Sequence, residues 1–175
     1  MKKVFFLISI CIGTLLQAQS EIGARFQIYP AGYISTAQYL FAAGSQGTLM
    51  FEIGYNTARR QDFGKHDDER GGGLGIGTGY RVYFNSERKA WFAETNFEFW
   101  WMSIDWKDRP GNSGTTDITI FQPTVGGGYL MRSKSEKWEA TIGASFGREW
   151  NIKTVGDPVG EGGISLLTFS VTRKF

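Results

Sequence analysis

The amino-acid sequence alternates between apolar and polar positions with a period of two over most of its length. The clearest segment is residues 74–84, where one face carries Leu74, Ile76, Thr78, Tyr80, Val82 and Phe84 and the other carries Gly75, Gly77, Gly79, Arg81 and Tyr83. Residues 49–56 and 138–147 repeat the pattern. Since neighbouring side chains of a β-strand point to opposite faces, this alternation predicts strands, with no convincing helix after the first 18 residues.

Turn-rich breaks divide the chain into eight candidate strands. They cover about residues 21–29, 35–44, 47–59, 72–84, 90–106, 115–133, 137–154 and 163–175. The breaks near residues 44–47, 85–89 and 133–137 are short, whereas those near 30–34, 61–71, 107–114 and 156–162 are mostly longer. An even number of strands, with short turns at one end and longer loops at the other, predicts an all-β, eight-stranded antiparallel up-and-down transmembrane β-barrel.

The polar face decides which side of the barrel meets lipid. It is rich in small groups such as Gly75, Gly77, Gly143 and Ser145, which suit the crowded lumen of a narrow barrel. Lys65, Lys89, Lys107, Lys134 and Lys137 fall in or beside turns, and the predicted strand faces are nearly free of lysine. A lysine on the lipid face near the midplane would cost about 2 to 4 kcal/mol. We therefore expect the apolar face to point outward. The alternative is a secreted, lipocalin-like soluble barrel that binds a small apolar ligand. Such a barrel shows the same alternation, with the apolar face inside and the polar face outside.

The first 18 residues differ from the rest of the chain. Lys2 and Lys3 precede an apolar run, residues 4–16, and the small Ala18 follows this run. The run is shorter than the roughly 20 residues of a membrane-spanning helix. This predicts a signal peptide, residues 1–18, and an outer-membrane barrel domain, residues 19–175. Cys11 lies in the predicted signal, so we expect no disulfide. Without Lys2 and Lys3 the chain has 17 basic and 17 acidic residues, so nucleic acid is not an expected partner.

The last ten residues, LLTFSVTRKF, carry large apolar groups at alternate positions up to Phe175. Leu167, Phe169, Val171 and Phe175 share one face, which predicts a lipid-facing strand ending in an interfacial aromatic. With this ending, the chain after residue 18 resembles the small eight-stranded outer-membrane barrels typified by the OmpA membrane domain and OmpX. The loop strings RQDFGKHDDERGGG and GDPVGEGG resemble those of short, largely uncharacterised barrels. The resemblance implies a bacterial outer-membrane location and an assembly signal, Phe169, Val171 and Phe175, that is read by the barrel-assembly machinery.

Strand parity places six charged side chains inside the predicted barrel. They are Arg25, Arg81, Glu52, Glu94, Glu98 and Glu139. Buried charges must pair, and an eight-stranded barrel has barely enough room for its own side chains. This favours a lumen plugged by ion pairs and hydrogen bonds over the alternative, a conduction path.

Aromatic residues and two irregular stretches refine the membrane geometry. Trp138 and Arg148 lie ten residues apart on one outward face and are expected to mark opposite interfaces. Pro123, in the predicted strand 115–133, lacks a backbone N–H, so we expect a bulge or break there. In the predicted strand 90–106, the segment WWMSIDW loses clean alternation after Trp101. This suggests that the strand bulges or leaves the membrane near Ser103. Aromatics suited to interfacial belts are Tyr29, Tyr55, Phe84, Trp91, Trp101, Trp106, Trp150 and Phe175.

Few motifs favour a chemical reaction. GASFG, residues 143–147, fits the G-x-S-x-G pattern of a nucleophile elbow, but it lies in a predicted strand and the only histidine, His66, precedes it. His66, Asp67 and Asp68 are weak metal candidates, since consecutive residues rarely all point at one ion. A lipid A-modifying enzyme using His66 with Asp67 or Ser113 is an alternative function, although no spacing supports it. We expect no catalytic residue, no cofactor and no metal.

Basic residues gather at the predicted long-loop end, interleaved with acidic ones. Arg59, Arg60, Lys107, Arg109, Arg148 and Lys153 are candidates for contacts with lipopolysaccharide phosphates, and the alternative is that they only keep the loops solvated. The sequence thus predicts a non-enzymatic, monomeric integral outer-membrane barrel with a structural or surface-interaction role. Its expected partners are outer-membrane lipid and lipopolysaccharide.

Overall fold

The computed structural model describes residues 20–61 and 64–175, so the predicted signal peptide lies outside the described residues. No helix in the described part of the chain is long and apolar enough to cross a membrane. All eight predicted strands are present; the start of β4 differs most, because it begins at Asp68 and not near residue 72. The strands are β1 (Ser20–Tyr29), β2 (Gly32–Ala43), β3 (Gly47–Gln61), β4 (Asp68–Tyr83), β5 (Ala90–Lys107), β6 (Ser113–Arg132), β7 (Trp138–Val155) and β8 (Gly162–Lys174).

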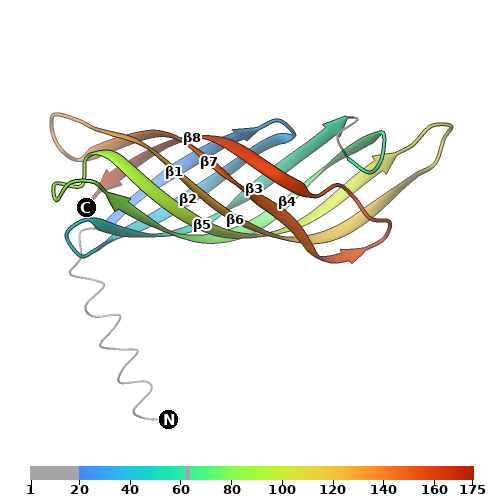
Figure 1. Ribbon diagram of the computed structural model, residues 1–175, viewed down its shortest axis with the longest axis horizontal. Helices are drawn as coiled ribbons and strands as arrows, with labels where there is room; N and C mark the ends of the chain where they lie inside the picture. The colour runs from blue at the N-terminus through green and yellow to red at the C-terminus, as the bar shows by residue number, and fades with distance from the viewer. Residues whose placement is uncertain (1–19, 62–63) are drawn as a thin grey trace, which may run out of the picture.

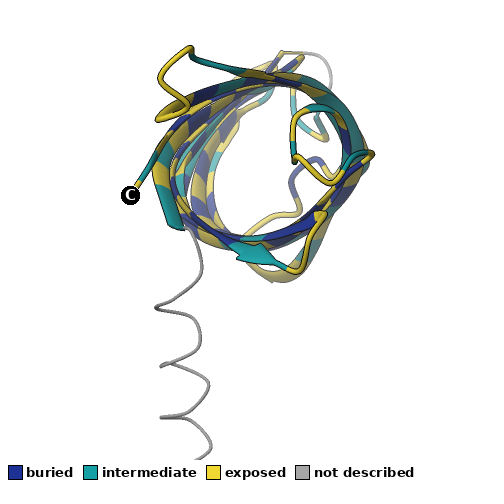
Figure 2. Cartoon of the chain, turned by 90° about the vertical axis from the view of Figure 1, so that its left-hand side faces the viewer, coloured by how far each residue is buried: buried dark blue, intermediate teal, exposed yellow. Residues whose placement is uncertain are grey.

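The strands form a closed antiparallel barrel in sequence order (Figures 1 and 2). β1 completes the ring by pairing with β8, from Glu21 opposite Lys174 to Ile28 opposite Leu167. The C-terminus lies at the end that carries the β2–β3, β4–β5 and β6–β7 turns, on the left in Figure 1. We call this the turn end and the opposite one the mouth end. The predicted eight-stranded up-and-down topology is confirmed.

Around the middle of the barrel, large apolar side chains point outward. Leu74 on β4 is 65% exposed and Ile142 on β7 is 47% exposed, whereas Arg25, Glu94 and Glu139 are buried. Figure 2 shows buried and exposed residues alternating along the strands. A broad exposed apolar girdle around a closed barrel is stable in hydrocarbon and not in water. The expected orientation is therefore confirmed, and the soluble lipocalin-like alternative is wrong.

The polarity reverses toward the mouth end, where β3 to β7 continue beyond the girdle. We call this part, residues 57–61, 68–73, 102–107, 113–120 and 151–155, the mouth extension. Its outer face carries exposed polar groups such as Arg59, Asp105, Asp117 and Lys153. Its inner face on β3, β5 and β6 contributes to an apolar cluster, next to the buried Arg60 and Glu69. The cluster consists of Tyr29, Ile34, Ala58, Trp100, Met102, Ile104, Trp106, Ile118, Ile120, Val159, Ile164 and Leu166. Apolar inside and polar outside is the pattern of a water-soluble β-structure, so the barrel combines two opposite polarities along one axis.

This reversal corrects two parts of the sequence interpretation. Tyr29 and Trp106, predicted as interfacial aromatics, are only 6% and 8% exposed and lie in the inner cluster. The other six belt candidates are exposed. Small and ionic groups were expected throughout the lumen. They fill the part within the girdle, whereas toward the mouth the interior combines the apolar cluster with a few buried charged groups, Arg60, Glu69 and Glu149.

The two expected strand irregularities have different outcomes. β5 runs unbroken to Lys107, so of the two expected outcomes near Ser103 the bulge is wrong. The other outcome, that the strand leaves the membrane there, agrees with the start of the mouth extension at residue 102. The sequence loses clean alternation there because the reversal puts Met102 and Ile104 inside and Ser103 and Asp105 outside. Near Pro123 the irregularity is confirmed: the β6–β7 pairing omits Gln122 and Pro123, and its register shifts between Thr119 and Ile120.

Connections at the mouth end are shorter than expected because strand pairing continues into them. Arg59 pairs with Arg70, Arg60 with Glu69, and Gln61 with Asp68. The connections that remain are residues 30–31, 62–67, 108–112 and 156–161. The mouth end is therefore built largely of paired strands, which hold their outward side chains at fixed positions.

Candidate functional site

The centre of the lumen contains a network of four charged side chains from four strands. Arg25 Nη1 lies 3.0 Å from Glu52 Oε1, and Arg25 Nη2 lies 3.2 Å from Glu94 Oε1. Arg81 Nη2 lies 2.8 Å from Glu94 Oε2. Gln38 Nε2 donates to Glu52 at 2.7 Å. All four charged groups are buried, as strand parity predicts, and each carboxylate has a cation within ion-pair distance.

The two remaining predicted lumen carboxylates lie apart from this network. Glu98 is buried and accepts a hydrogen bond of 2.7 Å from Gln122 Nε2. Glu139 lies toward the turn end, 2.7 Å from Arg132 Nε and 2.5 Å from Lys174 Nζ. The sequence reasoning missed these two cations, although both occupy the last positions of strands whose inward residues had been identified.

Arg60 was predicted to contact lipopolysaccharide, and its position requires a correction. Its side chain lies inside the mouth, 3.3 Å from Glu69 Oε2 and 3.0 Å from Glu149 Oε2, and all three residues are buried. β3 was expected to end at residue 59. Because the strand continues to Gln61, alternation carries Arg60 to the same inward face as Glu52 and Asn56. A guanidinium held there cannot reach a lipid phosphate outside the barrel.

Glu69 joins the two connections that fold over the mouth. It accepts hydrogen bonds from the backbone N–H of Lys65 at 2.8 Å and of Gly160 at 3.0 Å. The connection 156–161 is further held by Thr116 Oγ1, which donates to the carbonyl of Asp157 at 2.7 Å. Val159, from the same connection, is 1% exposed and packs on the inner apolar cluster. Backbone and side chains of this connection therefore cover the end of the barrel.

The other five lipopolysaccharide candidates have exposed side chains, in two separate groups. Arg59, Lys107 and Arg109 lie on or beside the β3–β5 side of the mouth extension. Arg148 and Lys153 lie on β7, with β6 between the two groups, and the Arg148 guanidinium is 6.0 Å from the centre of the Trp150 ring. The sequence reasoning missed the exposed Arg70, which pairs across the strands with Arg59.

His66, Asp67 and Asp68 do not converge on one point. His66 stacks on Trp106 with ring centres 4.0 Å apart, and its Nδ1 is 2.9 Å from Asp108 Oδ2. Asp68 pairs with Arg70 at 2.8 Å, and Asp67 accepts a hydrogen bond from the Arg109 N–H at 2.9 Å. Within residues 20–61 and 64–175, no group of three His, Cys, Asp or Glu side chains can hold a metal ion.

The remaining motifs have clear positions. Ser145 of GASFG is buried in the unbroken strand β7, so the segment lacks the strand-to-helix turn of a nucleophile elbow. Phe169, Val171 and Phe175 are exposed on the outer face at the turn end of β8. The backbone N–H of Phe175 donates to the carbonyl of Ser20 at 3.1 Å, which fixes the end of the chain against β1.

A closed eight-stranded barrel with an apolar girdle and a polar, ion-paired interior is the architecture of the small β-barrels of the bacterial outer membrane, and this chain has that fold. Its fold is similar to that of a major outer membrane protein from Thermus thermophilus, with 12% identity, coverage of 91% of this chain and 100% of that chain, and a TM-score of 0.60. It is also similar to Ail, the attachment invasion locus protein of Yersinia pestis, with 9% identity, coverage of 90% and 97%, and a TM-score of 0.52. Neisserial surface protein A gives 10% identity, coverage of 90% and 96%, and a TM-score of 0.52.

At these identities the similarity concerns the fold alone. No protein-family model matches the sequence, and no curated protein matches it.

Proposed function

We propose that this outer-membrane barrel is a non-enzymatic surface-interaction protein with a closed lumen. One observation carries the proposal: the mouth extension is mainly polar outside and encloses an apolar cluster inside. A part that only completed a membrane anchor would need no packed core of its own beyond the girdle. Strands that rise from the girdle around such a core instead form a rigid platform in water, on which exposed side chains have fixed positions.

The interior supports a closed lumen. The Arg25, Glu52, Glu94 and Arg81 network crosses its centre, Trp100 and its apolar neighbours follow toward the mouth, and Val159 covers them. An eight-stranded barrel leaves little space beyond such side chains. Purified protein in a planar lipid bilayer is therefore expected to give no discrete current steps. Reproducible steps of constant size would overturn the closed lumen.

Lipopolysaccharide is the partner that the outer charges fit best. Arg148 and Lys153 lie on β7 on either side of Trp150, an aromatic of the kind that marks the headgroup level. At that height a guanidinium and an ammonium can bind the sugar phosphates of the outer leaflet. The Ail structure contains a heparin analogue, sucrose octasulfate. We propose a related class of ligand for this chain, a polyanionic sugar, on the basis of its own exposed cations.

The test compares a charge-reversed protein with a matched control. Arg148→Glu with Lys153→Glu removes the candidate contacts, and Lys134→Glu with Lys137→Glu makes the same charge change at the turn end. Melting is followed by gel mobility without boiling, in vesicles with and without lipopolysaccharide. We expect lipopolysaccharide to raise the melting temperature of the wild type and the control and not of the first variant. Equal stabilisation of all three proteins would overturn the contact.

Two further parts of the proposal concern assembly and chemistry. We propose that Phe169, Val171 and Phe175 form the signal read by the barrel-assembly machinery, and that the barrel functions as a monomer. Phe175→Ser should slow folding by the purified machinery in vesicles, whereas Phe84→Ser, at the same end directly after β4, should not. For a non-enzymatic barrel, His66→Ala should leave the mass spectrum of cellular lipid A unchanged. A lipid A species lost in that variant would favour the enzyme.

A further inference from the structure

The wall of the barrel has a side notch near the mouth end, where β1 stops short. The β1–β8 pairing ends with Ile28 opposite Leu167, but β8 continues to Gly162, paired with β7 alone. Among the described residues, no strand pairs with residues 162–166 of β8 on the β1 side. In Figure 1 the β1–β2 turn, residues 30–31, lies well short of the other connections of that end.

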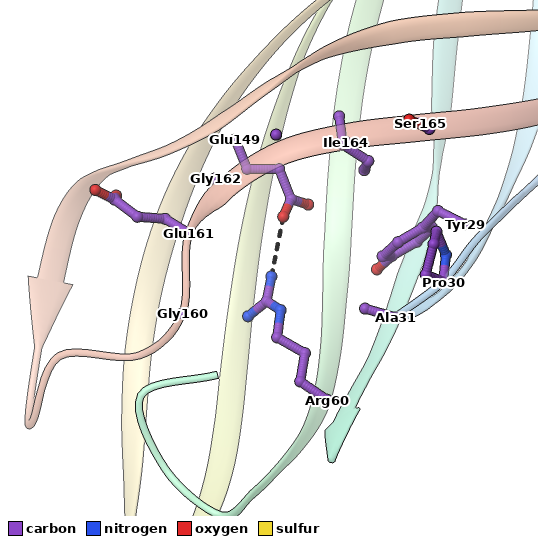
Figure 3. A pocket seen from close by; sticks show the side chains of 11 residues that line it. Tyr29, Pro30, Ala31, Arg60, Glu149, Gly160, Glu161, Gly162, Ile164 and Ser165 are labelled. Atoms are coloured by element: carbon purple, nitrogen blue, oxygen red, sulfur yellow. Dashed lines mark hydrogen bonds and ion pairs between the residues drawn. The ribbon is translucent and has the colours of Figure 1, made fainter. Parts of the chain in front are cut away.

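A cavity of about 360 Å³ opens at this notch. Its lining includes Tyr29 and Ala31 from the β1–β2 hairpin and Ile164 from β8, which supply an apolar wall. Arg60 and Glu149 form its inner wall, and Glu161 lies at its edge (Figure 3). Cavities of roughly 300 to 1,000 Å³ suit small molecules, so this one is at the small end of that range.

The charges around the cavity do not balance. Arg60 is the one cation among the lining residues, and it is already 3.3 Å from Glu69, behind the wall, as well as 3.0 Å from Glu149. The lining adds a second carboxylate, Glu161, which is exposed. The cavity therefore carries excess negative charge, and it favours a cation over an anion or a neutral ligand.

Glu149 has an unused hydrogen-bond acceptor in this wall. Its Oε2 receives Arg60, but its Oε1 has no hydrogen-bond partner among the described residues, although the side chain is only 7% exposed. In Figure 3 the carboxylate of Glu149 and the hydroxyl of Tyr29 extend from opposite sides of the cavity. A buried carboxylate oxygen without a donor is costly, so a ligand that donates to it would gain the energy of a charge-assisted hydrogen bond.

We propose that this notch is a binding site for a small organic cation with a primary ammonium group and a short aliphatic chain. The ammonium group donates to Glu149 Oε1 and to the Tyr29 hydroxyl oxygen, whose own hydrogen goes to Asn56 Oδ1 at 2.8 Å. The aliphatic chain packs on Ile164 and Ala31. The ligand enters from the side, between the β1–β2 turn and β8. The site is separate from the exposed cations of the surface-interaction proposal, so either one can fail without the other.

The experiment uses the folded barrel in detergent micelles and n-butylammonium chloride as the ligand, with 1-butanol as its neutral counterpart. Binding is followed by calorimetry and by the amide NMR shifts of Gly160, Gly162 and Gly163, which line the cavity. We expect saturable shifts at these glycines with butylammonium and none with butanol. Absence of saturable binding, or equal binding of butanol, would overturn the proposal.

Variants identify the carboxylate and the entrance. Glu149→Gln keeps an acceptor for Arg60 but removes the negative charge, and it should weaken butylammonium binding at least about tenfold. Glu139→Gln is the matched control, because it changes a buried, ion-paired carboxylate of the same strand at the other end. Ser165→Trp, at the exposed edge of the cavity, should block entry without touching the carboxylate. Unaltered affinity in either Glu149→Gln or Ser165→Trp, with gel mobility proving a folded barrel, would overturn the site.

Discussion

Arg25 and Glu94 form an ion pair that spans the lumen from one side of the barrel to the other. Arg25 Nη2 lies 3.2 Å from both carboxylate oxygens of Glu94, sixty-nine residues away in the chain. β1 and β5 are not neighbours in the sheet and stand opposite one another in the ring of eight. The pair therefore ties together strands that share no backbone hydrogen bond, and it contributes to the shape of the barrel as well as to the neutrality of its interior.

Replacing Arg25 with methionine should be strongly destabilising. The substitution leaves Glu52 without its cation and Glu94 with Arg81 alone, and breaking a buried ion pair from one side costs about 3 to 5 kcal/mol. The free energy of unfolding is measured by urea titration in lipid vesicles. Arg59→Met, on the exposed outer face, is the control and should change it by less than about 0.5 kcal/mol. Equal effects of the two substitutions would contradict the network.

Gly75 should tolerate no side chain, because the lumen is filled at its level. A Cβ there would lie 2.0 Å from Cε3 of the buried Trp100 indole, which cannot move without displacing the apolar cluster. Gly75→Ala should therefore cost about 1 to 3 kcal/mol by overpacking. At Gly77, two residues along the same strand, the nearest atom is the side-chain Cγ of Glu98 at 3.0 Å. Gly77→Ala is expected to be milder in the same urea titration, and the reverse order would be inconsistent with the packing.

Alternation was sufficient to predict the ring of strands and the girdle. A one-residue change of register moves every side chain of a strand to the other face, so the buried Arg25, Glu52 and Glu94 follow from their neighbours in the sequence. The same rule applied to Arg60 and Glu149 also gives inward positions. Arg60 was assigned to the outside because its segment was interpreted as a loop, and Glu149 was overlooked because it lies beyond the girdle.

Other features depend on contacts that no local pattern contains. At the reversal of polarity the side chains still alternate between the two faces of the strand, but the apolar face changes from the outer to the inner one. In the sequence this exchange looks like a loss of alternation near Trp101. The closure of the mouth rests on Glu69 and the backbone of Gly160, which lie ninety-one residues apart. The notch arises from the different lengths of β1 and β8. Strand length in a barrel is set by pairing with neighbours, and the sequence alone does not specify that pairing.

The His66–Asp108 contact should be visible in the titration of Asp108. The hydrogen bond from His66 is the main reason that the pKa of Asp108 lies below its ordinary value of 3.8. A carboxyl group whose pKa is lower in the folded state stabilises the fold fully above its ordinary pKa, and this contribution is lost as the pH falls through the lowered value. His66→Ala should raise the pKa of Asp108 toward 3.8, measured by carbon-13 NMR of the carboxyl group. Lys65→Ala is the control and should leave the pKa of Asp108 unaltered. An unaltered pKa in His66→Ala as well would contradict the contact.

Ile53 and Val155 test the reversal of polarity directly, because they are similarly exposed apolar residues at different heights. Ile53 on β3 is 61% exposed within the girdle, and Val155 at the end of β7 is 58% exposed on the mouth extension. Ile53→Lys places an ammonium in hydrocarbon and should cost about 2 to 4 kcal/mol in vesicles, whereas Val155→Lys, in water, should cost less than about 1 kcal/mol. The difference between the two should shrink in short-chain detergent micelles, where the thickness of the apolar layer adapts to the protein. Equal costs in vesicles would mean that lipid reaches the end of β7 and that the mouth extension does not stand in water.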